Sequence, residues 1–175
     1  MNLTWQKSES LVAPLALDTT LSKKAVYIRK NIEVVPIEDQ NGETVNKYVY
    51  DETTITPEEY KELGDNTAKV LYELALDTPV EYVNGHIYKP SYIYDYKGQI
   101  DDIKAPLELI AVAGGDISAV MPDLLTKTVY IYDATRKFEN REAMNIIELS
   151  HLYYFLFFKK EELYNAYREA LETVL

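Results

Sequence analysis

Residues 146–174 read IIELSHLYYFLFFKKEELYNAYREALETV and carry the clearest pattern in the sequence. An apolar residue recurs at every seventh position, at Leu149, Leu156, Leu163 and Ala170. Because that period matches two turns of an α-helix, the four side chains form one stripe. Asn145, followed three residues later by Glu148, resembles a capping box, which marks a helix start. The stretch therefore predicts a long final helix, from about Ile146 to Val174.

Four aromatic residues of this helix lie partly or wholly off the apolar stripe, namely Tyr154, Phe155, Phe157 and Phe158. A helix that is apolar all round over two turns must be covered on more than one side. Two interpretations are open, since the cover can come from sheets of the same domain or from another subunit. We take the four aromatic residues as candidate interface residues. In particular, we expect Phe155 or Phe158, or both, at a contact with another subunit or another protein.

Earlier in the chain, residues 25–51 have the pattern of a β-hairpin. Ala25 to Pro36 is rich in β-branched and aromatic residues, and Thr44 to Asp51 alternates as a returning strand does. Between them, Asn41-Gly42 supplies the two positive-φ positions of a tight turn. The segment therefore predicts two antiparallel strands.

A helix start follows at Thr56-Pro57-Glu58-Glu59. Thr56 can cap the helix, Pro57 suits its first position, and Glu59 can reach back to the cap. We expect this helix to break near Gly64 and to resume over residues 67–76.

The second half of the chain begins with another hairpin signature, around Asn84-Gly85. A run of tyrosines follows at mostly period-2 spacing, at Tyr88, Tyr92, Tyr94 and Tyr96. This spacing is typical of cross-strand packing, and stacking on sugar rings is the alternative. A helix is then predicted over residues 100–113, ended by Gly114-Gly115, followed by a strand over 128–133 and its partner over 137–144.

Residues 1–20 show no sustained period of a strand or a helix, so we expect an extended arm there. An arm stays ordered when it docks on its own domain or on a neighbouring chain, and Trp5 is its candidate interface residue. The rest divides into a hairpin-plus-helix module over residues 21–79 and a second module over 80–175. The expected fold class is α+β, with two β-hairpin modules covered by helices and ending in the long aromatic helix.

The composition excludes several classes of protein. Cysteine is absent, which removes disulfide scaffolds, thiolate metal sites and cysteine nucleophiles. Lys and Arg number 18 against 29 Asp and Glu, a net charge of −11. This charge repels phosphate backbones and anionic lipids, so we expect no direct binding to nucleic acid. The longest uninterrupted apolar run, residues 152–158, is too short to span a bilayer, so we expect no membrane insertion.

No set of residues that a catalytic mechanism requires is recognisable in the sequence. His86 and His151 are 65 residues apart and stand in no metal-ligand spacing. We expect His86 at a strand edge and His151 in the core or at its boundary. Serine nucleophile motifs are also absent. We therefore predict no catalytic residue, no cofactor and no metal ligand, and hence a protein that is not an enzyme.

Two groups of short motifs resemble small proteins of phages and prophages. Residues 26–33 (VYIRKNIE), 48–52 (YVYDE) and 55–60 (ITPEEY) are similar to a module in proteins encoded near tail, baseplate and tail-fibre genes. Residues 81–88 (EYVNGHIY), 129–133 (VYIYD) and the final helix are similar to an uncharacterised carboxy-terminal domain of tail-fibre-region proteins. Neither group transfers a functional residue.

The resemblance implies a non-enzymatic phage virion or virion-assembly protein of the tail, baseplate or fibre region. It would be made in the host cytoplasm and then located in the virion. The expected partners are other virion proteins and further copies of the same chain in a homo-oligomer. The alternative is a small acidic phage inhibitor of a host defence protein, and one form of such an inhibitor mimics nucleic acid by gathering carboxylates on one face.

Overall fold

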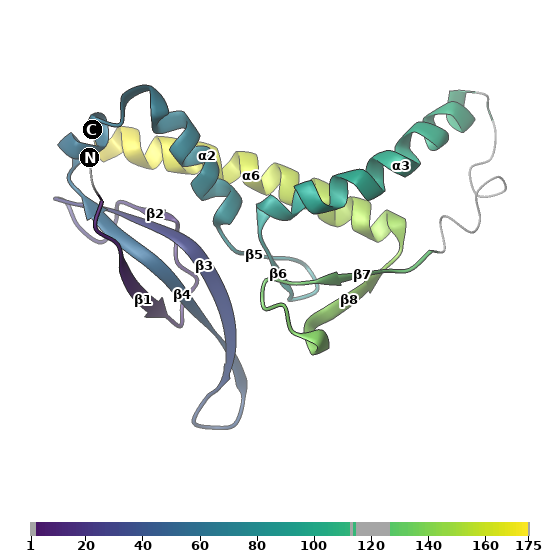
Figure 1. The fold of residues 1–175 in the computed structure, drawn as a ribbon, viewed down its shortest axis with the longest axis horizontal. Helices are drawn as coiled ribbons and strands as arrows, with labels where there is room; N and C mark the ends of the chain where they lie inside the picture. The colour runs from purple at the N-terminus through teal and green to yellow at the C-terminus, as the bar shows by residue number, and fades with distance from the viewer. Residues whose placement is uncertain (1–2, 113, 115–126, 175) are drawn as a thin grey trace.

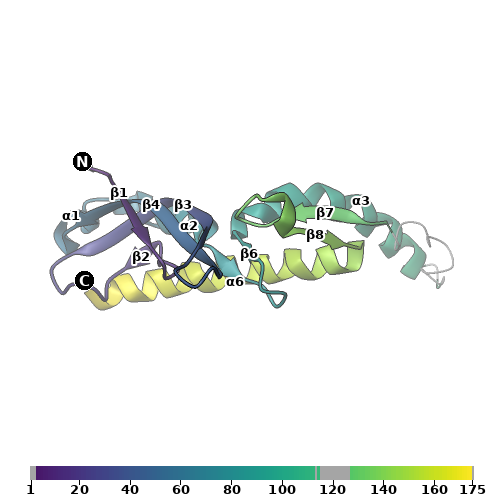
Figure 2. The same cartoon turned by 90° about the horizontal axis from the view of Figure 1, so that it is seen from below.

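The chain folds into helices and antiparallel strands, which confirms the predicted α+β class. The computed structural model describes residues 3–112, 114 and 127–174. Figure 1 shows helix α6 (Ile146–Val174) passing both groups of strands, one beside each half of the helix, while α3 (Ile93–Val112) extends beyond the N-terminal end of α6. Figure 2 shows the same two groups from below, separated along α6. The predicted final helix is thus confirmed, and it runs beside both groups of strands.

The first group is a four-stranded antiparallel sheet in the order β1-β4-β3-β2. β3 (Val26–Glu38) and β4 (Thr44–Ile55) form the predicted hairpin, which is longer than expected. The turn lies where it is predicted, but its predicted conformation is wrong, because Gly42 has a positive φ, of 77°, and Asn41 does not. Asp39 shapes the loop instead, since its carboxylate accepts hydrogen bonds from the N–H groups of Asn41 and Glu43, both at 2.8 Å.

Residues 6–10 and 17–18 pair with this sheet, so the segment predicted as an extended arm docks on its own domain. β1 (Gln6–Ser10) pairs with β4, and β2 (Leu17–Asp18) pairs with β3. The buried Arg29 of β3 holds the segment in place. Its guanidinium donates to the Asp18 carboxylate at 3.3 Å and to the Leu15 carbonyl oxygen at 2.9 Å. Of the two docking places expected for the segment, its own domain is the one observed.

The helices after the first hairpin begin where the sequence predicts. The Thr56 hydroxyl accepts a hydrogen bond from the Glu59 N–H at 3.2 Å, and the Thr56 N–H donates to the Glu59 carboxylate at 2.8 Å. α1 (Pro57–Lys61) is followed by the 3-10 turn η1 (Gly64–Asn66) and by α2 (Thr67–Asp77). The capping box and the break between the two helices are both confirmed.

Of the tyrosine run, Tyr88 ends the second hairpin, whereas Tyr92, Tyr94 and Tyr96 are helical, so the interpretation of the run as cross-strand packing is wrong. β5 (Val80–Glu81) and β6 (Ile87–Tyr88) form the predicted short hairpin. The chain then enters the 3-10 turn η2 (Pro90–Tyr92) and α3 (Ile93–Val112), which starts earlier than the predicted helix. Pro90 suits the first position of a helical turn, and this start sets the conformation of the tyrosines that follow.

The last hairpin and the start of α6 form where predicted, except that residues 138–140, predicted as part of the second strand, are a 3-10 turn. β7 (Val129–Tyr132) pairs antiparallel with β8 (Arg141–Met144), with the 3-10 turn η3 (Phe138–Asn140) between them. The Asn145 side chain accepts hydrogen bonds from the N–H groups of Ile147 and Glu148 at 2.9 and 3.0 Å. The Glu148 carboxylate accepts from the Asn145 N–H at 2.8 Å, which completes the capping box.

Two apolar cores lie along α6. The first packs the four-stranded sheet and α2 against the C-terminal half of α6, where Tyr167 and Leu171 are buried. The second packs α3, β6, β7 and β8 against the N-terminal half, where the buried residues are Leu149, Leu152 and Leu156. The Tyr167 hydroxyl accepts from the Ala16 N–H at 3.1 Å, which ties α6 to the first module. The two predicted modules therefore share one helix.

Candidate functional site

One face of α6 is open to solvent over the first half of the helix. Ile147, Tyr154 and Phe158 keep 50, 45 and 66% of their surface exposed. Together with the exposed His151 they follow a 4-3-4 spacing, which places them in one line along the helix. These four residues form the α6 stripe. The α6 stripe faces away from the leucine seam, which is the row of buried residues Leu149, Leu152 and Leu156 in the second core. Two of the predicted interface residues, Tyr154 and Phe158, therefore lie on an exposed surface.

The other two predicted interface residues on α6 are half-buried by the chain itself. The Phe155 ring packs edge-on against Tyr82, with ring centroids 4.9 Å apart. Phe157 stacks on Tyr153 at 6.5 Å, and the Lys160 ammonium lies 4.3 Å from the centre of its ring. The described residues therefore cover the leucine seam and both flanks of α6 but leave the α6 stripe exposed.

Trp5, the remaining predicted interface residue, is half-buried against the first core. The Lys30 ammonium lies 3.9 Å from the centre of its indole ring, in a cation–π contact. Trp5 thus packs on its own sheet.

The two histidines have different surroundings. His86 is close to two carboxylates, with Nδ1 3.3 Å from Asp133 and Nε2 2.9 Å from Glu142, and so connects the β5–β6 turn to the β7–β8 hairpin. His151 is exposed on the α6 stripe, so its predicted place in the core or at its boundary is wrong. Over the ranges that the structure describes, no group of three or more His, Asp and Glu could hold a metal ion.

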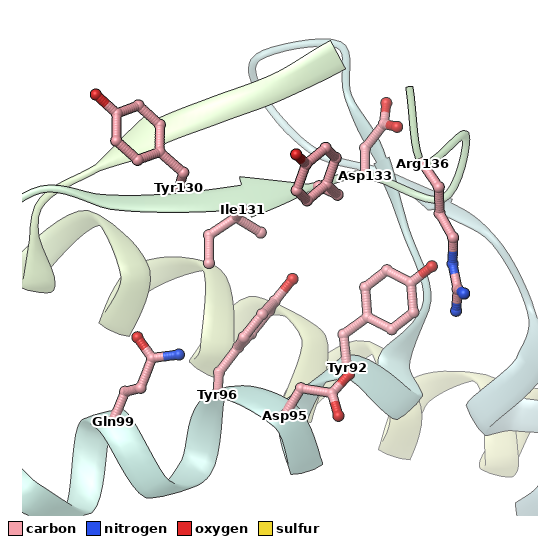
Figure 3. Close-up of a pocket in the computed structure, with 9 residues that line it drawn as sticks. Tyr92, Asp95, Tyr96, Gln99, Tyr130, Ile131, Asp133 and Arg136 are labelled. Carbon is pink, nitrogen blue, oxygen red and sulfur yellow. The ribbon is translucent and has the colours of Figure 1, made fainter. Parts of the chain in front are cut away.

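A groove of about 470 Å³ runs between α3 and β7 (Figure 3). One wall consists of Tyr92, Asp95, Tyr96 and Gln99, and the other of residues 130–133 and Arg136. Figure 3 shows Tyr96 pointing from α3 toward Ile131, while Tyr130 points away from α3. This space is the β7 groove. The sequence does not reveal this groove, because its walls are far apart in the chain and the spacing of the tyrosines resembles that of a strand.

The polar side chains that line the β7 groove differ in the hydrogen bonds they make within the protein. The Asp133 carboxylate already has partners within the protein, since it accepts a hydrogen bond from the Thr135 N–H at 2.9 Å and lies beside His86. Asp95 and Gln99 make no side-chain hydrogen bond or ion pair to any other residue that the structure describes. Burial raises the pKa of Tyr96, and it also raises the pKa of Tyr92 although the Arg136 guanidinium opposes the shift. Both phenols therefore stay protonated and able to donate near neutral pH.

The tyrosines of the predicted run do not form one platform. Tyr88 and Tyr96 are buried in the second core. Tyr94 is exposed elsewhere on α3, where its hydroxyl lies 3.1 Å from that of Tyr72. The helix spreads the rings around its axis, so the run does not present the shared surface that stacking on a sugar requires.

None of the helices in the described ranges is long and apolar enough to cross a membrane. Comparison of the chain with protein-family models, with curated proteins and with solved structures finds no match. The α6 stripe and the β7 groove are therefore interpreted from their geometry and chemistry.

Proposed function

We propose that the protein is a non-enzymatic phage virion or virion-assembly protein of the tail, baseplate or fibre region that self-associates through the α6 stripe. The observation that carries the proposal is the exposure of three large apolar side chains in line on one helix. Burying a single Phe side chain stabilises by about 1.5–3 kcal/mol, and grouped exposed apolar residues mark interaction surfaces. The phage assignment is supported by the resemblance of residues 26–33 and 129–133 described above.

A second copy of the chain fits the stripe because the stripe is symmetric in its spacing. The 4-3-4 pattern reads the same in both directions along the helix. A two-fold axis between His151 and Tyr154 sets Ile147 of one copy opposite Phe158 of the next. Each of the large apolar ends of the stripe then meets another apolar side chain.

Charge on α6 favours an antiparallel pair over a parallel one. Past the stripe, the same face continues with the exposed Glu161, Glu162 and Glu169. Glu161 and Glu162 form ion pairs with Lys160 and Lys159, whereas in a parallel pair Glu169 would lie beside its own copy, where like charges repel. An antiparallel pair moves the two copies of Glu169 to opposite ends. We therefore propose an antiparallel α6–α6 dimer contact.

Light scattering on the full-length chain tests the self-association. Phe158→Ser should lower the mass of the particle toward that of the monomer while circular dichroism stays unchanged, because the ring lies outside both cores. Tyr94→Ser is the matched control, since Tyr94 is an exposed aromatic residue on α3, outside the α6 stripe. A monomeric wild type, or a Phe158→Ser variant with unchanged mass, would contradict the proposed contact.

Mass spectrometry of purified phage particles tests the assignment to the virion. The protein should be found in the particles or in their assembly intermediates. Its absence from both, together with capture of a host defence protein, would favour the acidic inhibitor instead.

A further inference from the structure

We infer that the open edge of β7 binds an extended peptide segment of another protein, which adds as a third strand to the β7–β8 hairpin. β7 and β8 form a two-stranded sheet, so β7 has one edge without a partner strand among the described residues. Strand addition of this kind obtains affinity from main-chain hydrogen bonds and specificity from alternate side chains. The inference does not depend on the proposed self-association.

Natural edge strands carry features that prevent pairing with other chains, and β7 lacks them. Such features are charges, prolines, bulges and very short length. β1 carries Lys7 and Glu9, β8 carries Arg141 and Glu142, and β2, β5 and β6 have two residues each. β7 reads VYIY, four β-forming residues with no charge and no proline. Among the edge strands that the structure describes, β7 is therefore the one suited to accept a partner strand.

The lining of the β7 groove indicates that this edge is accessible. Side chains of a strand alternate between its two faces, so a cavity over one face contacts every second residue. The β7 groove instead contacts the four consecutive residues 130–133. It therefore runs along the backbone edge, toward which alternate residues of a two-stranded ladder direct their N–H and C=O groups.

The walls of the groove define the chemistry of the segment. Side chains of the added strand that face α3 would meet Tyr96 and Gln99, and those on the other face would lie beside Tyr130 and Tyr132. The last two rings keep 56 and 44% of their surface exposed. Asp95 and Asp133 outnumber Arg136 on the walls, and the whole chain carries a charge of −11. The partner is thus a segment with β-branched or aromatic residues at alternate positions and basic residues beside them.

A model peptide of this composition provides the test. The probe is fluorescein-labelled Lys-Val-Tyr-Val-Tyr-Val-Lys amide, titrated with the full chain and followed by fluorescence anisotropy. We expect saturable binding that is lost when alternate peptide nitrogens are methylated, because methylation removes main-chain donors. Replacing both peptide lysines by glutamate should weaken binding. Absence of binding, or equal binding of the methylated peptide, would overturn the inference.

A pair of protein variants locates the binding site. Tyr132→Lys places a charge on the edge and should weaken binding about tenfold, equivalent to about 1.4 kcal/mol. Tyr94→Lys, a matched exposed position on α3, should leave binding unchanged. Hydrogen exchange by NMR should show new protection of the outward amides of β7 when the peptide is bound. Protection confined to α6, or a change in the light-scattering mass with Tyr132→Lys, would contradict a peptide site on β7.

Discussion

Arg29→Met should destabilise the protein strongly, because it leaves the buried Asp18 carboxylate and the half-buried Glu52 carboxylate without their cation. The Arg29 side chain is buried and donates to Glu52 at 2.7 Å and to Asp18 at 3.3 Å. Breaking a buried ion pair by removing one partner costs about 3–5 kcal/mol of unfolding free energy. We expect the lower end, about 3 kcal/mol, because the Glu52 side chain is partly open to water. For a chain of this length the melting temperature should fall by about 6–12 °C.

The destabilisation should depend on pH in a defined direction. Burial acts to raise the pKa of Asp18, but hydrogen bonds from Thr20 and the Arg29 guanidinium outweigh it and hold the pKa below its ordinary value of 3.8. A carboxylate with a lowered pKa stabilises the fold above its unfolded pKa, and this contribution is lost as the pH falls through the folded pKa. The difference in unfolding free energy between the wild type and Arg29→Met should therefore become smaller below about pH 4.

Urea denaturation followed by circular dichroism at pH 7 and pH 3 measures both effects. Lys7→Met is the control, because Lys7 makes an exposed ion pair with Asp51 at 3.1 Å and should cost less than about 1 kcal/mol. A loss below about 1 kcal/mol for Arg29→Met at pH 7 would refute the role assigned to the buried pair. A loss of the same size at both pH values would refute the role of Asp18.

Two further substitutions test α6. Leu156→Ala should lower the unfolding free energy by about 2–5 kcal/mol, because Leu156 is fully buried, and an unchanged urea midpoint would be incompatible with the second core. Asn145→Ala should cost about 1 kcal/mol by removing the helix cap, whereas the exposed Asn165→Ala should stay within about 0.5 kcal/mol of wild type. Equal midpoints for the two asparagine variants in thermal denaturation would count against the cap.

Features encoded within a few residues were predictable from the sequence. The capping boxes at Thr56 and Asn145 are examples, because donor and acceptor lie three residues apart and report directly on a helix start. The hairpin over β3 and β4 was predictable because β-forming residues stand on both sides of a short turn-forming segment. Contacts between distant positions were not predictable. Residues 17–18 show no strand periodicity, yet they form β2, where Asp18 makes an ion pair with Arg29 of β3.

In the candidate site, too, local patterns were predictable and long-range packing was not. Helical periodicity predicted which residues share a face of α6, but it could not predict which face the chain itself covers. Phe155 is half-buried because Tyr82, from a distant hairpin, packs on it, while Phe158 stays open. The tyrosine run was misread because period-2 spacing over a few residues also fits a helix, in which Tyr92 and Tyr96 are one turn apart.

Cysteine cross-linking tests the antiparallel α6 pair most directly, because the chain has no cysteine of its own. A disulfide requires Cα atoms about 4.4–6.8 Å apart. In the antiparallel pair Ile147 lies opposite Phe158 of the second copy, whereas the two copies of either position are about 16 Å apart along the helix axis.

Ile147→Cys and Phe158→Cys proteins should therefore be oxidised separately and as a mixture, and analysed on non-reducing gels. We predict a covalent dimer in the mixture and none in either protein alone. Cross-linking of each variant with itself would indicate a parallel pair, and the absence of any dimer in the mixture would contradict self-association through the α6 stripe.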